Sequence, residues 1–600
     1  MATDTKADSK LVRIGGASGF WGDSMVGAPQ LVRSGQIDYL VFDYLAETTM
    51  AILAAARRKN AEAGYATDFI DVVMKAVLPD VVRQGIKVIA NAGGINPQGC
   101  ADALRRVAQA QGLSPRIAVV EGDDVGPLLP ELRAAGQRDM FSGQALPERV
   151  LSANAYLGAL PIARALDAGA DIVITGRCVD SAVTLGPLVH EFGWGVDEYD
   201  KLAGGSLAGH IIECGCQGTG GLFTDWEQVP DWAGIGYPIV ECEADGSFMV
   251  TKAPGTGGLI ARAAVAEQLL YEIGDPGAYL LPDVICDFRQ VRIEQVDAEH
   301  VRVSGARGLA PTDQCKVSTT VLDGFRCAGT MVVIGIDAAA KARRTGEAIL
   351  TRTRTIFRER GLPDYSATHI EVIGAETMYG PHARTAATRE VMMRVVVDHV
   401  SKEALEIFAR EIAPSGTSWS PGTTSPGGGR PPVSPLVKQI AFLIDKRRLK
   451  PAYLLDGERS TVDLPLPGGA VPADEGLEPP PWPASDEAGV KVPLVKLAWA
   501  RSGDKGNLSN IGLIARRPEW LPLLWREVTP EAVKAYFAHL VKGSVRRHYL
   551  PGIAAMNLLL EDALDGGGPA SMRMDPLGKG MAQMLLDLPV RVPPSVAAAL

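Results

Sequence analysis

The most constraining feature of this sequence is the alternation of short apolar runs with helical patterns over its first 180 residues. Short, continuously apolar runs are typical of strands buried on both faces. Helical patterns between such strands predict a parallel sheet covered by helices, so we expect an α/β fold here. The predicted strands are Val12–Ile14, Tyr39–Tyr44, Lys87–Ala90, Ile117–Glu121 and Asp171–Thr175, and the predicted helices are Thr48–Ala63, Asp68–Gln84 and Gly99–Gln111.

After about residue 235 the pattern changes to hairpin signals, followed by a β-α-β-β-α order up to residue 412. That order predicts an α+β layer with helices on one face. Residues 414–435 are rich in Ser, Thr, Gly and Pro, which favours a mobile loop or lid. A Pro-rich tract then predicts an interdomain linker before a small α+β domain. The predicted units are 11–455 (an α/β part at 11–234 and an α+β part at 235–455), 456–493 (linker) and 494–592.

Charge and composition exclude several classes of protein. Sixty basic and 70 acidic side chains give a net charge of −10, which argues against nucleic acid as a partner. The first ten residues lack an apolar run and no run is long enough to cross a bilayer, so we expect a cytoplasmic protein without a membrane partner. Eight scattered cysteines indicate reduced thiols. Large α/β proteins commonly form symmetric oligomers, so we expect a homo-oligomer.

Loops of small or polar residues follow four of the predicted strands. In parallel sheets, ligands bind at the carboxyl ends of the strands, and exposed loop amides favour an anion. The first loop offers Gly16, Ser18 and Gly19, although a purely structural turn would use the same glycines. Its spacing is not G-x-G-x-x-G, which argues against a dinucleotide cofactor. The loop after the third strand offers Asn91 and Gly94.

Carboxylates suited to acid–base work also lie at these strand ends. Asp43 ends the second strand and Glu47 follows one turn later. The two could divide general acid and base roles, or one could hold a divalent metal, whereas an acidic residue opening a helix would merely complement its dipole.

The predicted strand that ends at Thr175 is followed by a polar loop. Arg177 in this loop would clamp a carboxylate or phosphate. Asp180 and Ser181 could transfer a proton or cap the next helix. Cys178 is interpreted as an inert thiol, since the sequence places no activating base beside it.

Two further stretches could bind a ligand or a metal. Lys252 with Gly255 and Gly257 could hold the diphosphate of a coenzyme A thioester, although the lysine precedes the glycines and the loop is not a Walker A motif. His210, Cys214 and Cys216 could bind zinc, but they lack clearly paired ligand spacing. We therefore assign no metal ligands.

The C-terminal domain opens with a dense polar loop, and we expect an apolar strand on each side of it. Arg501, Lys505 and Asn507 would contact an anion, and Asp504 would orient it or accept a proton. A solvated turn is the alternative, although such a turn needs fewer polar residues.

Several of these motifs, taken in order along the chain, resemble the acyclic terpene utilisation (AtuA-like) family. They are Ile14–Asp23, Ala90–Gly94, Thr175–Asp180 and Lys252–Gly258, and the block Arg501–Asn507 resembles the ferredoxin-fold domain fused to many members. The resemblance implies a role in bacterial catabolism of acyclic terpenes such as citronellol and geraniol through branched acyl-CoA intermediates. It also implies a ferredoxin-like fold for the C-terminal domain.

The leading hypothesis is a hydratase or lyase acting on an acyl-CoA thioester by proton transfer. Asp43, Glu47, Asp180 or Asp504 would move the proton, and amides of the glycine loops would stabilise the enolate oxygen. No cofactor is assigned, and a divalent metal stays open. The alternatives are a non-catalytic acyl-CoA-binding or scaffold subunit, and a hydrolase that uses Cys178 or Ser181.

Overall fold

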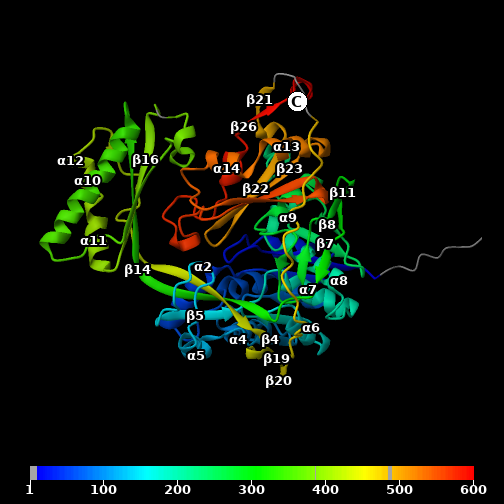
Figure 1. Cartoon of the computed structure of the whole chain (residues 1–600). Coiled ribbons are helices and arrows are strands. Elements are labelled where there is room, and N and C mark those ends of the chain that lie inside the picture. The colour runs from blue at the N-terminus through cyan, green and yellow to red at the C-terminus, as the bar shows by residue number, and fades with distance from the viewer. Residues whose placement is uncertain (1–9, 386, 484–488) are drawn as a thin grey trace, which may run out of the picture.

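The computed structural model describes residues 10–385, 387–483 and 489–600, and its centre is a parallel β-sheet. Strands β1, β2, β3, β6 and β4 lie side by side in that order and run parallel, which confirms the predicted α/β class (Figure 1). Their carboxyl ends therefore meet at one edge of the sheet, here called the carboxyl edge. The bounds are β1 Val12–Gly16, β2 Tyr39–Phe42, β3 Lys87–Ala90, β4 Ile117–Glu121 and β6 Ile172–Thr175.

Antiparallel strands extend this sheet to eleven strands within the described residues. Beside β1 lie β7 Pro238–Cys242, β8 Phe248–Lys252, β12 His300–Ser304 and β11 Arg292–Asp297. Beside β4 lie β19 Ala452–Leu455 and β20 Glu458–Thr461. The predicted boundary at 234/235 is therefore not a structural boundary, because the hairpins that follow it continue the first sheet.

Helices cover both faces of the central strands, as the alternation predicts. One face packs on α1, α2, α3 and α4, and the other on α6, α7 and α8. The helix predicted at 68–84 begins as a π-helix, η1 Phe69–Met74. The bounds are α1 Gly27–Ser34, α2 Glu47–Lys59, α3 Lys75–Gln84, α4 Pro97–Ala110, α5 Leu129–Ala134, α6 Leu160–Asp167, α7 Ala182–Phe192, α8 Tyr199–Ile212 and α9 Arg262–Leu270.

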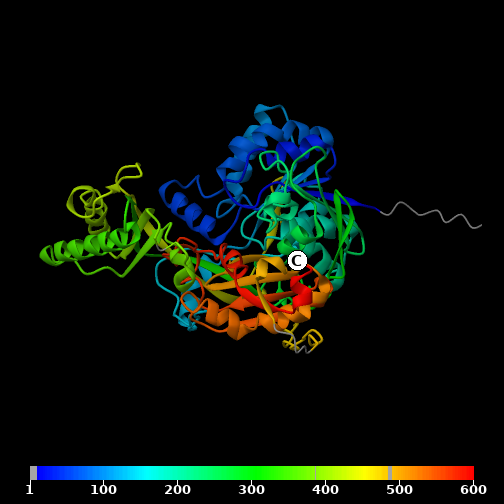
Figure 2. The same cartoon turned by 90° about the horizontal axis from the view of Figure 1, so that it is seen from above.

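A separate α+β layer, here called the arm, projects from this body (Figures 1 and 2). Its spine is the 21-residue strand β14, which pairs with β5 and β18 near the body and with β16 and β17 farther out. The segment 414–435, predicted as a loop or lid, belongs to the arm, where β17 pairs with the end of β14. The bounds are β5 Val150–Ala155, β14 Gln314–Ile334, α10 Ala338–Glu359, β15 Ala367–Ile373, β16 Glu390–His399, α11 Lys402–Glu411, α12 Ser415–Ser418, β17 Thr423–Thr424 and β18 Val433–Asp445.

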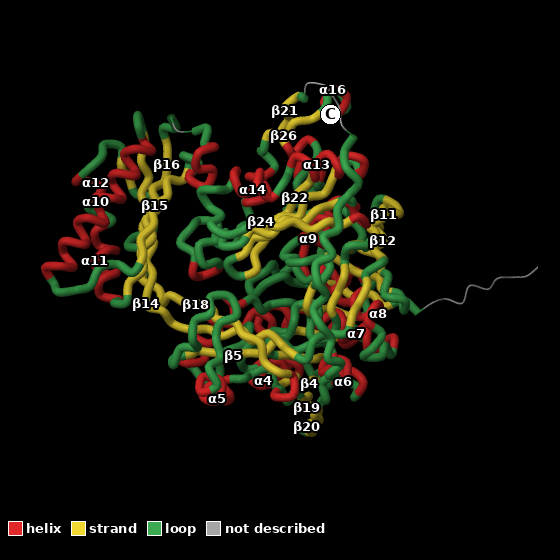
Figure 3. The backbone as a smooth tube through the Cα atoms, viewed as in Figure 1, coloured by secondary structure: helices red, strands yellow, loops and turns green. Residues whose placement is uncertain are grey.

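The C-terminal domain is a four-stranded antiparallel sheet in the order β22-β23-β25-β24, with helices on one face (Figure 3). The predicted polar loop at 501–507 is not a loop for most of its length, because β22 runs through Lys505 before the hairpin turns. The bounds are β21 Val490–Pro493, β22 Ala498–Lys505, β23 Leu508–Ala515, α13 Leu521–Glu527, α14 Pro530–Tyr536, β24 Val545–Leu550, β25 Ala555–Leu560, α15 Met581–Leu585, β26 Pro589–Val592 and α16 Pro594–Ala597.

A small three-stranded sheet, β13-β10-β9, packs beside α8, and its strands are β9 Tyr279–Leu280, β10 Ile285–Asp287 and β13 Arg307–Leu309. Over the described ranges, every helix is too short or too polar to span a bilayer.

Candidate active site

The first part of the candidate site lies at the carboxyl edge, where β2 and β3 end beside each other. Asp43 follows β2 and is buried, and Asn91 follows β3 and is fully buried. The Asn91 side-chain amide donates to Asp43, and its carbonyl accepts the Tyr44 backbone N–H at 2.7 Å. Ser18, from the loop after β1, donates to the Asp43 backbone carbonyl at 3.3 Å. The neighbouring strand ends thus hold the Asp43 carboxyl group in a fixed position.

A buried arginine follows β6 at the same edge. The Arg177 side chain is only 3% exposed, and its Nη1 donates to Asp180 Oδ1 at 2.8 Å. Its guanidinium stacks on the Tyr156 ring, with the Arg177 Cζ 4.0 Å from the ring centroid. The Arg177 backbone N–H also donates to the buried Asp123 carboxylate at 2.9 Å. These contacts fix a planar cation beside Asp43.

A second cation reaches the site from β14. The Tyr156 hydroxyl donates to Glu47 Oε1 at 2.6 Å, and Lys316 Nζ lies 3.4 Å from the same oxygen. Lys316 Nζ is also 4.9 Å from the Tyr156 ring centroid. Neither Lys316 nor Tyr156 was predicted as a site residue. Each is a single residue in or beside an ordinary strand, and only the tertiary pairing of β5 with β14 brings them to the edge.

The hairpin of the C-terminal domain supplies the remaining side. Lys579 Nζ lies 2.9 Å from Glu272 Oε1 and 3.7 Å from Asp504 Oδ1, and it also contacts the Tyr271 hydroxyl. Lys505 Nζ lies 5.9 Å from the Tyr279 ring centroid. Charges at the carboxyl edge act on the hairpin. The Asp180 carboxylate contributes to a raised pKa of Lys505, and the Glu47 carboxylate contributes to the raised pKa of Asp504.

Two glycines, which have no side chain, allow the hairpin to approach α9 and the residues that follow it closely. A Cβ on Gly503 would lie 2.6 Å from Glu272 Cγ, and one on Gly512 would overlap Leu270. Buried amides then fix the contact, since Asn510 Nδ2 donates to the Leu270 carbonyl at 2.6 Å and Asn557 Nδ2 donates to the Ile273 carbonyl at 2.8 Å. This packing sets the position of the hairpin end against the carboxyl edge.

Burial and neighbouring charges move the pKa values of the acidic groups apart. Burial raises the pKa of Asp43 well above its ordinary value, with the charges of Asp180 and Glu213 adding to the effect. Burial likewise raises the pKa of Glu213, against the favourable contact with His210. Burial and the charge of Glu272 raise the pKa of Asp504 to about 7.

Glu47 shifts in the other direction. Burial alone would raise its pKa, but Lys316, Arg177 and the Tyr156 hydroxyl outweigh burial and hold the pKa well below the ordinary value. Raised pKa values favour the neutral form of three nearby carboxyl groups, those of Asp43, Glu213 and Asp504. The positive charge of the site is therefore only partly balanced, and it comes from Arg177, Lys316, Lys505 and Lys579. The arrangement can hold an anion and keeps one carboxyl group, that of Asp504, near its titration point at neutral pH.

Two residues predicted to bind an anion have structural roles instead. Arg501 is buried, and it donates to Gln217 Oε1 at 2.7 Å, to the Gly221 carbonyl at 3.0 Å and to Glu267 Oε2 at 3.2 Å. It therefore anchors the C-terminal domain to the N-terminal domain. Asn507 organises a loop of its own domain, because its side chain bonds to Asp562, Leu564 and Gly566.

The glycine loops also differ from the prediction that their amides stabilise an enolate oxygen. The Gly19 N–H donates to Asp23 Oδ2 at 2.8 Å and the Gly94 N–H donates to the Asn91 carbonyl at 3.3 Å, so both amides are occupied. A Cβ on Gly16 would lie 2.6 Å from the Ile212 carbonyl, so this glycine allows α8 to pack against β1.

Lys252 and its loop lie at the same edge, but two strands away from β1. Lys252 Nζ donates to the Thr256 carbonyl and pairs with Glu299, both at 2.9 Å. The Gly257 N–H donates to the Gly234 carbonyl at 2.7 Å, and Gly255 forms a turn with positive φ. Lys252 is therefore engaged by its own loop and by Glu299 of the turn between β11 and β12.

The nucleophile and zinc alternatives find little support in the geometry. Burial raises the pKa of Cys178 to about 12, which keeps it a thiol, and Ser181 packs under α8 against Gly209. His210 bonds to Glu213 and to the Leu269 carbonyl rather than to a cysteine. Over the described ranges, no three acidic, His or Cys side chains of this site converge as metal ligands.

Comparison with known protein families matches residues 12–455 to the acyclic terpene utilisation family protein AtuA. The chain belongs to this family. Residues 492–591 match the AtuA ferredoxin-like domain, which confirms the expected fold of the C-terminal domain. The candidate site of this family member lies where the two matched regions meet. Comparisons with curated proteins and with solved structures returned no match.

Proposed function

We propose that this protein is an enzyme of acyclic terpene or related branched-chain catabolism that moves a proton on an acyl-CoA thioester, as a hydratase or lyase does. The observation that carries the proposal is Asp504. Its carboxyl group has a pKa of about 7 and lies beside Lys579, and the charge of Glu47, from the carboxyl edge, adds to the rise in that pKa. A general base works best when its pKa lies near the working pH.

In this mechanism Asp504 takes the proton from the carbon next to the thioester carbonyl. Lys505, whose side chain reaches solvent, stabilises the negative charge that develops on the carbonyl oxygen. Arg177 and Lys316 hold an anionic group of the substrate, and Glu47 keeps both cations in place. Asp43, whose pKa burial raises, donates a hydrogen bond to the substrate or to water when its carboxyl group is protonated.

Proton abstraction is tested by exchange in deuterated water. Purified full-length protein is incubated with geranyl-CoA-derived thioesters, and deuterium uptake is followed by mass spectrometry. The wild-type protein should catalyse exchange, and Asp504→Asn should lower the rate by about 10²–10⁴-fold.

The matched control is Asp565→Asn, since Asp565 is an Asp of the same domain that pairs with Lys542 at the surface. This variant should exchange at the wild-type rate. Tight thioester binding without exchange by the wild-type protein would favour the scaffold alternative. Loss of activity after thiol alkylation would favour the hydrolase alternative.

A further inference from the structure

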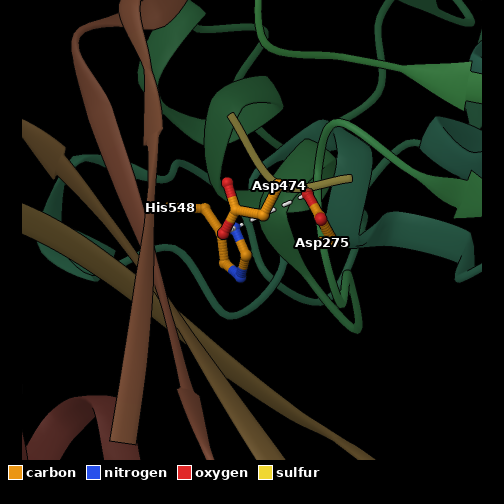
Figure 4. A group of neighbouring side chains, drawn as sticks. All are labelled: Asp275, Asp474 and His548. Carbon is orange, nitrogen blue, oxygen red and sulfur yellow. Dashed lines mark ion pairs between the residues drawn. The ribbon is translucent and has the colours of Figure 1, made fainter. Parts of the chain in front are cut away.

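Three side chains from distant parts of the sequence meet where both domains contact the Pro-rich segment. Asp275 lies in the turn after α9, Asp474 lies in the segment 456–493, and His548 lies on β24 (Figure 4). One carboxylate oxygen of each aspartate and one imidazole nitrogen lie within 4.8 Å of one another. None of the three was predicted as a ligand, because nothing in their local sequence links them.

The spacing within this group fits ligands of a common ion. His548 Nδ1 lies 3.5 Å from Asp275 Oδ1 and 3.5 Å from Asp474 Oδ2. Both distances are long for a hydrogen bond. Two atoms that each bind a zinc ion at about 2.1 Å in tetrahedral geometry stand about 3.4 Å apart.

The two carboxylates of the group also lack a lysine or arginine partner within the part of the chain that the structure describes. Over the described ranges, neither Asp275 nor Asp474 forms an ion pair with a lysine or arginine, and the nearby Arg289 pairs with Asp287 and Glu475 instead. The His548 side chain is buried, its Nε2 has no hydrogen-bond partner among the described residues, and its Nδ1 faces the two carboxylates at 3.5 Å (Figure 4). Two carboxylates that face a buried imidazole with no cation between them are unfavourable, and a bound cation would remove that cost.

We propose that Asp275, Asp474 and His548 bind a divalent transition-metal ion of the Zn²⁺ class. An imidazole nitrogen with two carboxylate oxygens is a donor set that suits such ions, and water would complete the coordination. Backbone amides hold the carboxylates ready, because Gly277 N–H donates to Asp275 at 2.8 Å and Gly476 N–H donates to Asp474 at 2.9 Å.

The ion would stabilise the contact between the domains and takes no part in the proton chemistry. It joins the N-terminal domain, the Pro-rich segment and the C-terminal domain at one point. His548 pairs across the sheet with Asn557, whose side chain holds the Ile273 and Gly274 carbonyls. Metal binding therefore fixes the chain just after α9, next to Glu272 of the candidate active site.

The test uses full-length protein stripped with a chelator and dialysed, then titrated with Zn²⁺. Bound metal is measured by mass spectrometry, and thermal unfolding is recorded at each step. Asp474→Asn removes one ligand from an exposed position, so that the variant folds, and Asp463→Asn is the matched control from the same segment. Cleavage of residues 464–483 by a protease gives an independent readout.

We expect wild type and Asp463→Asn to bind one Zn²⁺ ion at this site. Asp474→Asn should either lose that ion or bind it at least about tenfold more weakly. Zn²⁺ should raise the unfolding temperature and slow cleavage of the segment in these two proteins and not in Asp474→Asn. Equal Zn²⁺ binding by wild type and Asp474→Asn would overturn the proposal, as would a wild-type protein that binds no Zn²⁺. Neither result bears on deuterium exchange, so the proposed function is tested separately.

Discussion

The two halves of the candidate site differ in how their residues reach it. In the sheet half, Asp43, Asn91 and Arg177 follow parallel strands that lie side by side, and parallel strands end at one edge. In the hairpin half, Arg501 to Lys505 belong to one antiparallel strand. Successive side chains of such a strand point to opposite faces, and their depth changes along it. The end of a parallel strand therefore indicates which side chains lie near one another, whereas a polar stretch along an antiparallel strand does not indicate which of its side chains share a face.

Replacing Arg177 should have the largest effect, since it is the charge on which the sheet half depends. Arg177→Met removes a buried cation and leaves Asp43, Asp180 and Glu47 without it. Breaking a fully buried ion pair costs about 3–5 kcal/mol, and the partial exposure of the Asp180 and Glu47 side chains reduces this to about 2–3 kcal/mol here. We expect the free energy of unfolding, measured by urea denaturation, to fall by that amount.

The matched control is Arg164→Met. Arg164 pairs with Asp167 at the surface, with a side chain that is 52% exposed. Its replacement should cost less than about 1 kcal/mol. An Arg177→Met variant as stable as this control would show that the sheet half does not depend on its buried cation.

The hairpin half should govern how the exchange reaction depends on pH. If Asp504 is the base, the exchange rate is constant above about pH 7 and falls about tenfold for each pH unit below, or about 100-fold at pH 5. The residual rate of Asp504→Asn should lack this dependence. A wild-type profile without an inflection near pH 7 would remove Asp504 from the mechanism.

The same shift has a consequence for stability with a defined sign. The pKa of Asp504 is raised from an ordinary value of 3.8 to about 7, so the folded state binds its proton more tightly than the unfolded state does. The Asp504 contribution therefore favours folding at low pH and is lost as the pH rises from about 4 to about 7. Asp504→Asn should reduce this decline, as pH-dependent denaturation would show.

The fold and the sheet half were largely predictable, for a physical reason. The buried strands β1 to β4 and β6 are mostly apolar, and Asp43 and Arg177 follow the ends of β2 and β6 by one and two residues. Lys316 and Tyr156 were not predictable, because the long-range pairing of β14 with β5 that brings them together is not encoded in any local pattern. The same limit hid the continuation of the first sheet by β7 and β8.

Gly512→Val tests whether close packing on α9 places the hairpin. A Cβ at residue 512 would overlap Leu270, and overpacking of this kind costs about 1–3 kcal/mol. We expect a lower urea midpoint together with slower deuterium exchange, since the hairpin end moves away from the carboxyl edge. Gly274→Ala is the control, because a Cβ there meets nothing within 4 Å. Unchanged exchange in Gly512→Val would show that the hairpin position is set elsewhere.

Asn507→Ala should have the smallest effect and distinguishes the two kinds of polar residue in the hairpin. The variant loses the hydrogen bonds that hold the loop at Asp562, Leu564 and Gly566, which predicts a loss of about 1 kcal/mol in the free energy of unfolding. Thioester binding, measured by calorimetry, should stay unchanged because Asn507 is engaged within its own domain. A tenfold weaker affinity would instead restore Asn507 to the ligand contacts, and the polar stretch would then act as a single binding loop.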